Sequence, residues 1–329
     1  MTGLSDLLPC RRDSPALDLT PERKRLATMK TGFSSLTCPQ WDLQTIVTKA
    51  AEFGFDGVEL NGLFGQTHRA LTPELIAKPE DVRRLFAEHN VELLCLSTST
   101  TLDRIEPFRV AEDRARIVEH IELAGKLGCP HVRILPGKMG MVDSPARALS
   151  RIAYALQALI PVAVESRVTL LLENGGDYLT SDAVWFLVDA LSHPAARCSW
   201  NQFTALYEGE RPTRSIPRLG QKLGLVHLCD GEFNERGVLR GYRPLGEGDA
   251  EIAKQIELLK GIAYQGYLVV EWPKERVASL PEPEEALPVA VEFLQARFAE
   301  KQAILTAYKG DKKAPKFAAL RSPATPIGV

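Results

Sequence analysis

The sequence lacks the features that mark several large classes of protein. Its 329 residues include six cysteines, and none of them forms a Cys-x-x-Cys pair. Paired-cysteine zinc or redox motifs are therefore excluded, and a chain of this length can stabilise a core without a disulfide framework. Cys95 and Cys229 lie within apolar runs. This placement favours buried free thiols in a reducing compartment.

Long apolar runs and an excess of one charge are also missing. No run approaches the ~20 apolar residues that cross a bilayer, and residues 1–28 lack the apolar stretch of a secretory signal. We therefore expect a cytoplasmic protein without a membrane partner. The chain has 40 Lys and Arg against 42 Asp and Glu. This near-neutral balance argues against a nucleic-acid partner, and an anionic small substrate would need local Arg or Lys residues.

Composition divides the chain into three segments. Residues 1–28 are rich in Pro, Arg and Asp, and we interpret them as an N-terminal extension with a short helix at 21–29. Residues 29–300 alternate between apolar runs and segments of helical period. Residues 301–329 form a C-terminal tail that is basic and Pro-rich from about Lys309, which is typical of a solvated tail.

The apolar runs of the middle segment predict eight buried strands, at 31–34, 57–60, 91–97, 132–135, 168–173, 197–201, 224–228 and 267–271. Nearly continuous apolar strands are typical of a parallel sheet that helices cover. The starts of successive runs are 26 to 43 residues apart, which leaves room for a helix and two loops.

The segments between the runs carry a helical period. One apolar stripe comprises Leu43, Ile46, Val47, Ala50 and Phe53, and another comprises Leu149, Ile152, Leu156, Leu159 and Ala163. Pro161 falls within the second stripe, where it should kink or end the helix. Candidate N-caps are Asp42, Ser144 and Ser181, and candidate C-cap glycines are Gly54, Gly128 and Gly266.

Eight strand-helix units predict an α/β protein, a single-domain (β/α)₈ TIM barrel. The main competitor is an open Rossmann-type sheet, which should show a Gly-x-Gly-x-x-Gly turn after an early strand. The glycine-containing segments at 32–34 and 62–65 do not fit that pattern.

Polar residues at the strand ends indicate where the chemistry lies, because functional groups of such barrels sit at the carboxyl ends of the strands. Glu173, His227 and Glu271 each close an apolar run. A buried carboxylate is costly unless it is paired or binds a cation. Each residue alone has a structural explanation, because a glutamate at a strand end can form a salt bridge at the barrel rim and a histidine on an apolar strand can be a core residue. Together they predict a centre for a divalent metal, Mn²⁺, Mg²⁺, Zn²⁺ or Co²⁺.

The chain resembles the xylose-isomerase-like superfamily, specifically its sugar phosphate isomerase/epimerase branch, from about Lys30 to Ala299. The resemblance is carried by Gly54-Phe-Asp-Gly-Val-Glu-Leu60, Leu171-Leu-Glu-Asn174, Val226-His-Leu-Cys-Asp-Gly231, Pro244-Leu-Gly-Glu-Gly-Asp249 and Gly266-Tyr-Leu-Val-Val-Glu271. The pair His-Leu-x-Asp-Gly and Leu-Gly-Glu-Gly-Asp, in that order, is the more specific part.

The resemblance implies four metal ligands, Glu173, Asn201, His227 and Glu271, with the two glutamates also acting as the catalytic acid-base pair. The family has Asp at the position of Asn201, and it has His or Asn three residues later, at the position of Thr204. This chain departs from the family at both positions. A neutral amide removes one negative charge and should weaken the metal site. Leu179 lies where ketohexose epimerases often carry a polar residue, which argues against that particular enzyme.

Four further residues are candidates for substrate binding. Arg133 ends the fourth predicted strand, where it could hold a carboxylate, a phosphate or a hydroxyl pair, or form a salt bridge to Glu59 or Glu173. Glu59 ends the second strand, Lys274 follows the eighth, and Trp41 could stack on a sugar ring.

The function that follows is a metal-dependent isomerase or epimerase of a sugar, or of a related polyol or keto acid, working through an enediolate. One alternative is a lyase that dehydrates a keto-inositol-like polyol on the same scaffold. Another is a non-catalytic sugar-binding homologue. A homo-oligomer is compatible with the sequence. The superfamily's apurinic-site endonuclease branch needs a richer cluster of ligands than six histidines supply.

Overall fold

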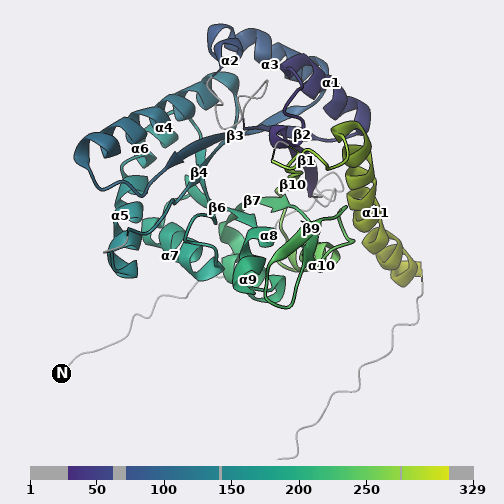
Figure 1. The fold of residues 1–329 in the computed structure, drawn as a ribbon. Helices are drawn as coiled ribbons and strands as arrows, with labels where there is room; N and C mark the ends of the chain where they lie inside the picture. Colours follow the sequence, from purple (N-terminus) through teal and green to yellow (C-terminus); the bar gives the residue numbers. More distant parts are fainter. Residues whose placement is uncertain (1–28, 62–71, 141–142, 275, 311–329) are drawn as a thin grey trace, which may run out of the picture.

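Eight parallel strands close into a barrel in the computed structural model, which describes residues 29–61, 72–140, 143–274 and 276–310. Their order around the barrel is β1, β10, β7, β6, β5, β4, β3, β2. Helices form a ring outside the strands (Figure 1). The strands are β1 Lys30–Ser34, β2 Gly57–Leu60, β3 Glu92–Thr101, β4 His131–Leu135, β5 Thr169–Glu173, β6 Ala196–Asn201, β7 Leu223–Leu228 and β10 Tyr267–Val270. The predicted (β/α)₈ barrel is confirmed.

The helices fill the gaps between the strands, as a right-handed crossover requires. They are α1 Leu43–Phe53, α2 Pro73–Ala77, α3 Pro79–Glu88, α4 Pro107–Leu127, α5 Pro145–Gln157, α6 Ile160–Glu165, α7 Ser181–Leu191, α8 Gln202–Ala205, α9 Pro212–Leu219, α10 Ile252–Gly261 and α11 Pro283–Gly310. Within the described ranges, short 3-10 turns accompany them at Ser35–Thr37, Leu206–Glu208 and Gly220–Lys222.

Most of the predicted helix ends are confirmed. Asp42 Oδ1 accepts a hydrogen bond from Thr45 N at 2.7 Å, and Ser144 caps α5 in the same way. Gly54 and Gly128 end α1 and α4 with φ angles of 83° and 70°, which glycine adopts without strain. The helix predicted across Pro161 is broken, since α5 ends at Gln157 and α6 begins at Ile160.

Two predicted caps are wrong. Ser181 is the first residue of α7 rather than its cap, because the Glu210 carboxylate binds both the backbone N–H and the hydroxyl of Ser181. Gly266 does not end a helix, because α10 already ends at Gly261. The carbonyl of Gly266 instead accepts a hydrogen bond from Lys30 N at 3.2 Å and joins the start of β1.

Successive inward-facing residues divide the barrel interior into an apolar part and a polar part. Alternate residues of a strand face the same side, and an apolar cluster that includes Leu171, Leu225 and Val269 lies inside the barrel. Two residues further along the same three strands come Glu173, His227 and Glu271. The apolar cluster is therefore a floor for the polar residues at the carboxyl ends.

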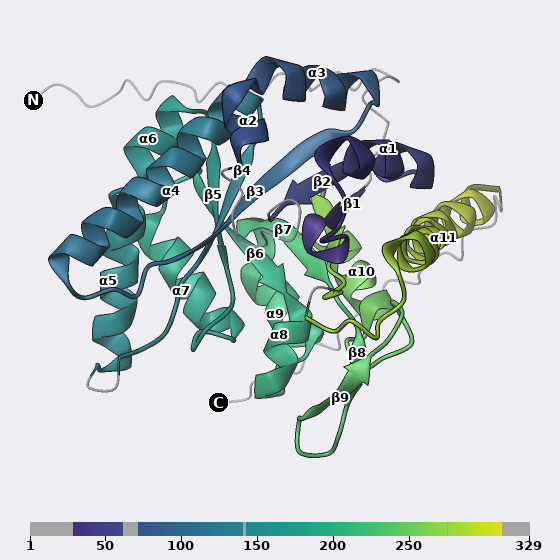
Figure 2. The ribbon, with the colours of Figure 1, turned by 45° about the horizontal axis from the view of Figure 1, so that its top comes forward.

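A β-hairpin interrupts the regular alternation after β7. Its strands are β8 Gly231–Phe233 and β9 Leu239–Tyr242, which pair antiparallel. The hairpin projects from the end of the barrel where β7 stops (Figure 2). Asp230 is buried just before it, and its carboxylate accepts hydrogen bonds from the backbone N–H groups of Gly231, Gly246, Gly248 and Ala250.

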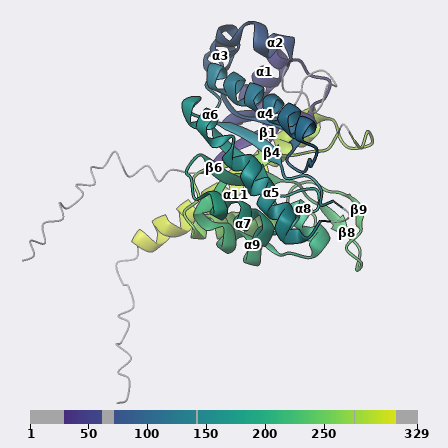
Figure 3. The ribbon, with the colours of Figure 1, turned by 90° about the vertical axis from the view of Figure 1, so that its left-hand side faces the viewer.

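The last helix reaches beyond the ring. α11 continues past residue 300, the predicted end of the barrel segment, and its end at Gly310 projects from the barrel (Figure 3). The predicted helix at 21–29 falls almost wholly on residues 1–28, which lie outside the described residues, as do residues 311–329. Five cysteines, Cys38, Cys95, Cys129, Cys198 and Cys229, are buried free thiols as predicted.

By length and composition alone, one described stretch could cross a membrane, Pro145–Glu165. It comprises α5 and α6, which bury Ala148, Ile152, Leu156 and Ala163 in the hydrophobic core of the barrel.

Candidate metal centre

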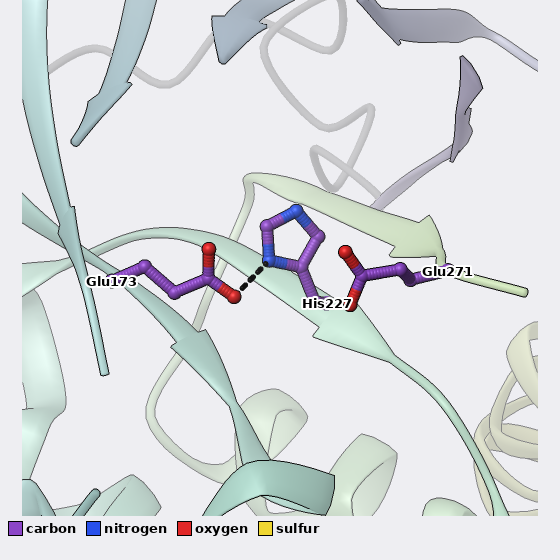
Figure 4. A group of neighbouring side chains, drawn as sticks. All are labelled: Glu173, His227 and Glu271. Atoms are coloured by element: carbon purple, nitrogen blue, oxygen red, sulfur yellow. Dashed lines mark hydrogen bonds and ion pairs between the residues drawn. The ribbon is translucent and has the colours of Figure 1, made fainter. Parts of the chain in front are cut away.

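Three side chains from three strands converge at the carboxyl end of the barrel. Glu173 ends β5, His227 lies in β7, and Glu271 directly follows β10. One ligand atom from each lies within 4.8 Å of the others. Figure 4 shows Glu173 and Glu271 approaching the imidazole of His227 from opposite sides. The three residues that the sequence singled out are therefore neighbours.

Both ring nitrogens of His227 face carboxylates. Nδ1 lies 3.1 Å from Glu173 Oε1 and 3.3 Å from the hydroxyl of Ser199. Nε2 lies 2.6 Å from Glu59 Oε2. A carboxylate on one nitrogen of a histidine orients the ring and makes the other nitrogen a better metal ligand. Glu59 is placed to do this, which leaves Nδ1 available to a metal beside Glu173.

Arg133 is buried within the same cluster. It forms salt bridges to both Glu59 and Glu173, which the sequence allowed as an alternative to substrate binding. Its Nη1 lies 2.9 Å from Glu173 Oε2, and its Nε lies 3.6 Å from Glu59 Oε1. Ser97 bridges the two, because its hydroxyl donates to Glu59 and accepts from Arg133 Nε at 3.0 Å. Arg133 thus compensates the charge of two buried carboxylates.

These contacts separate the pKa values of the two catalytic candidates. Burial raises the pKa of Glu173, but the charges of His227 and Arg133 outweigh burial and lower the pKa to about 2. Burial also raises the pKa of Glu271, and the neighbouring Glu173 and Glu59 raise it further against the opposing effect of His227. Two carboxyls with separated pKa values are the usual arrangement of an acid-base pair.

The histidine of the cluster is strongly basic in the protein without a metal. Burial lowers the pKa of His227, but Glu59, Glu173 and Glu271 together raise it well above its ordinary value. A divalent metal at this place would supply the positive charge that a proton supplies on the imidazole.

Asn201 is close to the centre but presents its nitrogen to it. Its Nδ2 donates to Glu271 Oε2 at 2.9 Å, and its Oδ1 accepts from Thr204 N at 3.3 Å to cap α8. Asn174 holds the backbone of Asn201 in place through two hydrogen bonds. Ligation through Oδ1 would require rotation of the amide and loss of the contact to Thr204.

Two other predicted substrate residues have contacts elsewhere. Trp41 is buried beside Phe33, and its indole N–H donates to Glu284 at 3.2 Å. Lys274 Nζ donates to the carbonyls of Ala278 and Leu280 and to Glu282. These bonds use all three donors of the ammonium group and tie together the loop after β10.

A pocket opens beside the centre, with Glu271 and Asn201 in its wall. Its other lining residues are Leu36, Phe203, Thr204, Tyr207, Cys229, Tyr242, Pro273 and Arg276. Sequence reasoning missed Arg276, Tyr207 and Tyr242, because the last two reach the pocket only through the unpredicted hairpin and α8 region. The position of Arg276, five residues beyond the strand-ending Glu271, was the one signal available.

The donor set fits a divalent metal. Two carboxylates and one imidazole suit Mn²⁺, Zn²⁺ or Co²⁺, and all three side chains emerge from rigid strands. Carboxylates this close repel each other unless a cation lies near them. Arg133 provides one such charge on the side of Glu173, and Asn201 provides only a neutral donor on the side of Glu271.

The fold and this cluster define a TIM barrel with a candidate metal centre at the carboxyl ends of its strands. The xylose isomerase-like TIM barrel family matches residues 47–297. The match covers more than half of the chain, and the protein belongs to this family. No curated protein matches the sequence.

Similar solved structures include enzymes of more than one reaction type. The IolI protein with a bound zinc atom has a TM-score of 0.72 at 18% identity, over 83% of this chain and 99% of its own. L-ribulose 3-epimerase has a TM-score of 0.68 at 17% identity, over 87% of this chain and 100% of its own. The probable 3-DHS dehydratase AsbF from Bacillus anthracis has a TM-score of 0.66 at 17% identity, over 81% and 99%. At these identities the likeness concerns the fold.

Proposed function

We propose that the protein is a metal-dependent isomerase or epimerase of a sugar or a related polyol or keto acid. The observation that carries this proposal is the convergence of Glu173, His227 and Glu271, whose ligand atoms lie within 4.8 Å of one another. The proposed ligands are these three residues and, after rotation of its amide to present Oδ1, Asn201. L-ribulose 3-epimerase and D-psicose 3-epimerase are among the similar structures, which supports a reaction of this class.

The two glutamates are placed to exchange a proton with one substrate carbon. Glu173 belongs to β5 and Glu271 follows β10, and two strands lie between them in the barrel. Their carboxylates therefore reach a bound substrate from different sides, so one can remove a C–H proton and the other can return one. The buried floor beneath them limits the access of water from the barrel interior.

The remaining residues hold this pair in place. A bound divalent ion would supply polarisation of the substrate carbonyl and stabilise negative charge on the adjacent oxygens. Arg133 fixes Glu173, Glu59 fixes His227, and Asn201 donates to Glu271 in the metal-free protein. The buried free thiols support a reducing compartment such as the cytoplasm.

A dehydratase is the second candidate, because the AsbF structure is titled as a probable dehydratase. The first step would be the same removal of a C–H proton by a glutamate. The reaction would then lose a hydroxyl from the neighbouring carbon as water. Product mass separates the two reactions, since an isomerase conserves mass and a dehydratase loses one water.

Metal analysis of the purified protein, followed by hydrogen exchange in D₂O, tests the proposal. We expect one divalent ion per chain and incorporation of deuterium at a substrate carbon across a panel of ketoses and keto-polyols. Glu173→Gln and Glu271→Gln should each reduce exchange by ~10²–10⁴-fold. The matched control is Glu92→Gln, which alters an exposed carboxylate paired with Lys30. Ligand binding without any exchange in the wild-type protein would instead identify a non-catalytic homologue.

A further inference from the structure

Arg276 brings an additional positive charge to the pocket beside the proposed metal centre. Its side chain lines the same pocket as Glu271 and Asn201, and the residue is exposed. No carboxylate within the described ranges pairs with its guanidinium at salt-bridge distance. An arginine is strongly suited to binding carboxylates and phosphates through paired N–H donors. A guanidinium in this position is therefore available to a ligand.

The charges of the centre make this arginine significant. Glu59, Glu173 and Glu271 carry three negative charges when ionised, and Arg133 together with a bound divalent ion would carry three positive charges. With His227 neutral as a metal ligand, the centre would then be balanced, and the neutral Asn201 would add nothing. The negative charge of a substrate anion near this centre would be uncompensated unless another cation lay close to the anion. Of the described residues that line the pocket, Arg276 is the one that carries a positive charge.

The same pocket also offers neutral hydrogen-bond donors. Tyr207 and Tyr242 line it together with Thr204. The ring of Tyr242 stacks on Phe203 with the centroids 5.5 Å apart, and it meets Trp272 edge-on at 6.5 Å. Burial raises the pKa of Tyr242 to about 12, so its hydroxyl keeps its proton. The pocket thus joins fixed hydroxyl donors to one guanidinium.

The loop that carries Arg276 is held in place. Lys274 binds the carbonyls of Ala278 and Leu280 and the carboxylate of Glu282, and Arg276 N donates to Pro273 O at 3.0 Å. These bonds define a turn around Arg276. The guanidinium therefore projects from a constrained loop.

We propose that Arg276 binds an anionic group of the substrate, a carboxylate or a phosphate, so that the substrate is an acidic sugar derivative rather than a neutral ketose. The reacting carbon would lie between Glu173 and Glu271, and the anionic end would extend into the pocket toward Arg276. The inference rests on the proposed function for the place of the reaction. The anion-binding role of Arg276 can be measured without turnover.

Binding of three matched compounds to the metal-loaded full chain tests this inference. D-fructose, D-fructuronate and D-fructose 6-phosphate differ only at C6, where they carry a hydroxymethyl, a carboxylate and a phosphate ester. Calorimetric titration should show that at least one of the two anions binds about tenfold to a hundredfold more tightly than D-fructose. The anion that binds more tightly identifies the group. Arg276→Gln should abolish the preference, so that the anion binds no more tightly than D-fructose.

The control variant is Arg236→Gln, which removes an exposed arginine from the turn of the β8–β9 hairpin. It should retain the wild-type preference. If neither anion binds the wild-type protein more tightly than D-fructose, or if Arg276→Gln keeps the preference, the inference is overturned. If the preference depends on Arg276 but no deuterium exchange occurs with any compound, the proposed reaction fails while the anion site stands.

Discussion

Individual residues of the centre have roles that depend on which atoms face them. Glu59 was predicted to bind substrate, yet its carboxylate is buried against Nε2 of His227 and the hydroxyl of Ser97. Arg133 was also predicted to hold substrate, and both of its ion pairs are with buried glutamates. We therefore propose that Glu59 and Arg133 position the ligands Glu173 and His227.

The affinity for metal should depend on pH through His227. Its pKa in the metal-free protein is raised by Glu59, Glu173 and Glu271. The protonated imidazole therefore stabilises the metal-free fold below the unfolded pKa of about 6.5, and this contribution is lost as the pH rises through the folded pKa. A metal requires the neutral imidazole. Affinity for Mn²⁺, measured by calorimetry, should thus increase with pH across the same range.

Glu59→Gln tests two effects of this carboxylate, which are to raise the pKa of His227 and to orient its imidazole ring. The variant should lower the pKa of His227, so that the rise in Mn²⁺ affinity moves to lower pH. Its affinity at high pH should be ~10–100-fold weaker, because the ring loses a partner that orients it. Glu92→Gln is the exposed control. An unchanged affinity profile for Glu59→Gln would contradict a positioning role.

At the scale of elements, the motif after β7 is explained by backbone geometry. Asp230 accepts four backbone hydrogen bonds, two of them from Gly246 and Gly248. A Cβ atom on Gly248 would lie 2.3 Å from Asp230 Oδ1, so only glycine fits there. The two motifs, His-Leu-x-Asp-Gly at 227–231 and Leu-Gly-Glu-Gly-Asp at 245–249, therefore fasten the β8–β9 hairpin to the barrel. Tyr242 of β9 reaches the pocket through this connection.

Asp230→Asn should destabilise the protein and loosen the hairpin. The amide replaces one carboxylate oxygen by an NH₂ group, which faces backbone N–H donors instead of accepting from them. We expect the free energy of unfolding to fall by about 3 kcal/mol, measured by urea denaturation. Asp81→Asn, on the exposed face of α3, should stay within about 0.5 kcal/mol of the wild type. Equal stability of Asp230→Asn would show that the hairpin is held by other contacts.

At the scale of the whole molecule, the centre links strands that are distant in sequence. The proposed ligands Glu173, His227 and Glu271 belong to or follow β5, β7 and β10, with β6 between β5 and β7. A bound metal would therefore connect the carboxyl ends of half of the barrel. The opposite half is connected by packing and by the Glu59–Ser97–Arg133 contacts.

Metal binding should accordingly slow hydrogen exchange in one half of the barrel. Mn²⁺ added to the metal-free protein should protect the amides at the ends of β5, β7 and β10, because local opening there would require a ligand to dissociate. The outer helices α3 and α4 should exchange at the same rate with and without Mn²⁺. Uniform protection of all the elements, or none, would contradict a metal held between these strands.

The sequence by itself determined the barrel and pointed to the three residues that converge at its carboxyl end, Glu173, His227 and Glu271. Apolar runs at regular intervals predict eight buried strands whatever the details of the loops, since a parallel sheet must be covered on both faces. A polar residue at the end of such a run predicts the active end of the barrel. Glu173, His227 and Glu271 each stand at the end of such a run, although the sequence carries no information on the distances between them.

Only the tertiary structure decided which polar residues face one another. Glu59 and His227 are 168 residues apart, and no local pattern shows that they are partners, because barrel closure sets that contact. The orientation of the Asn201 amide depends on Thr204 and Glu271 together. The place of Arg276 in the pocket depends on a loop that Lys274 fastens and on a hairpin that Asp230 anchors. These contacts are set by packing between elements, which residue spacing along the chain does not encode.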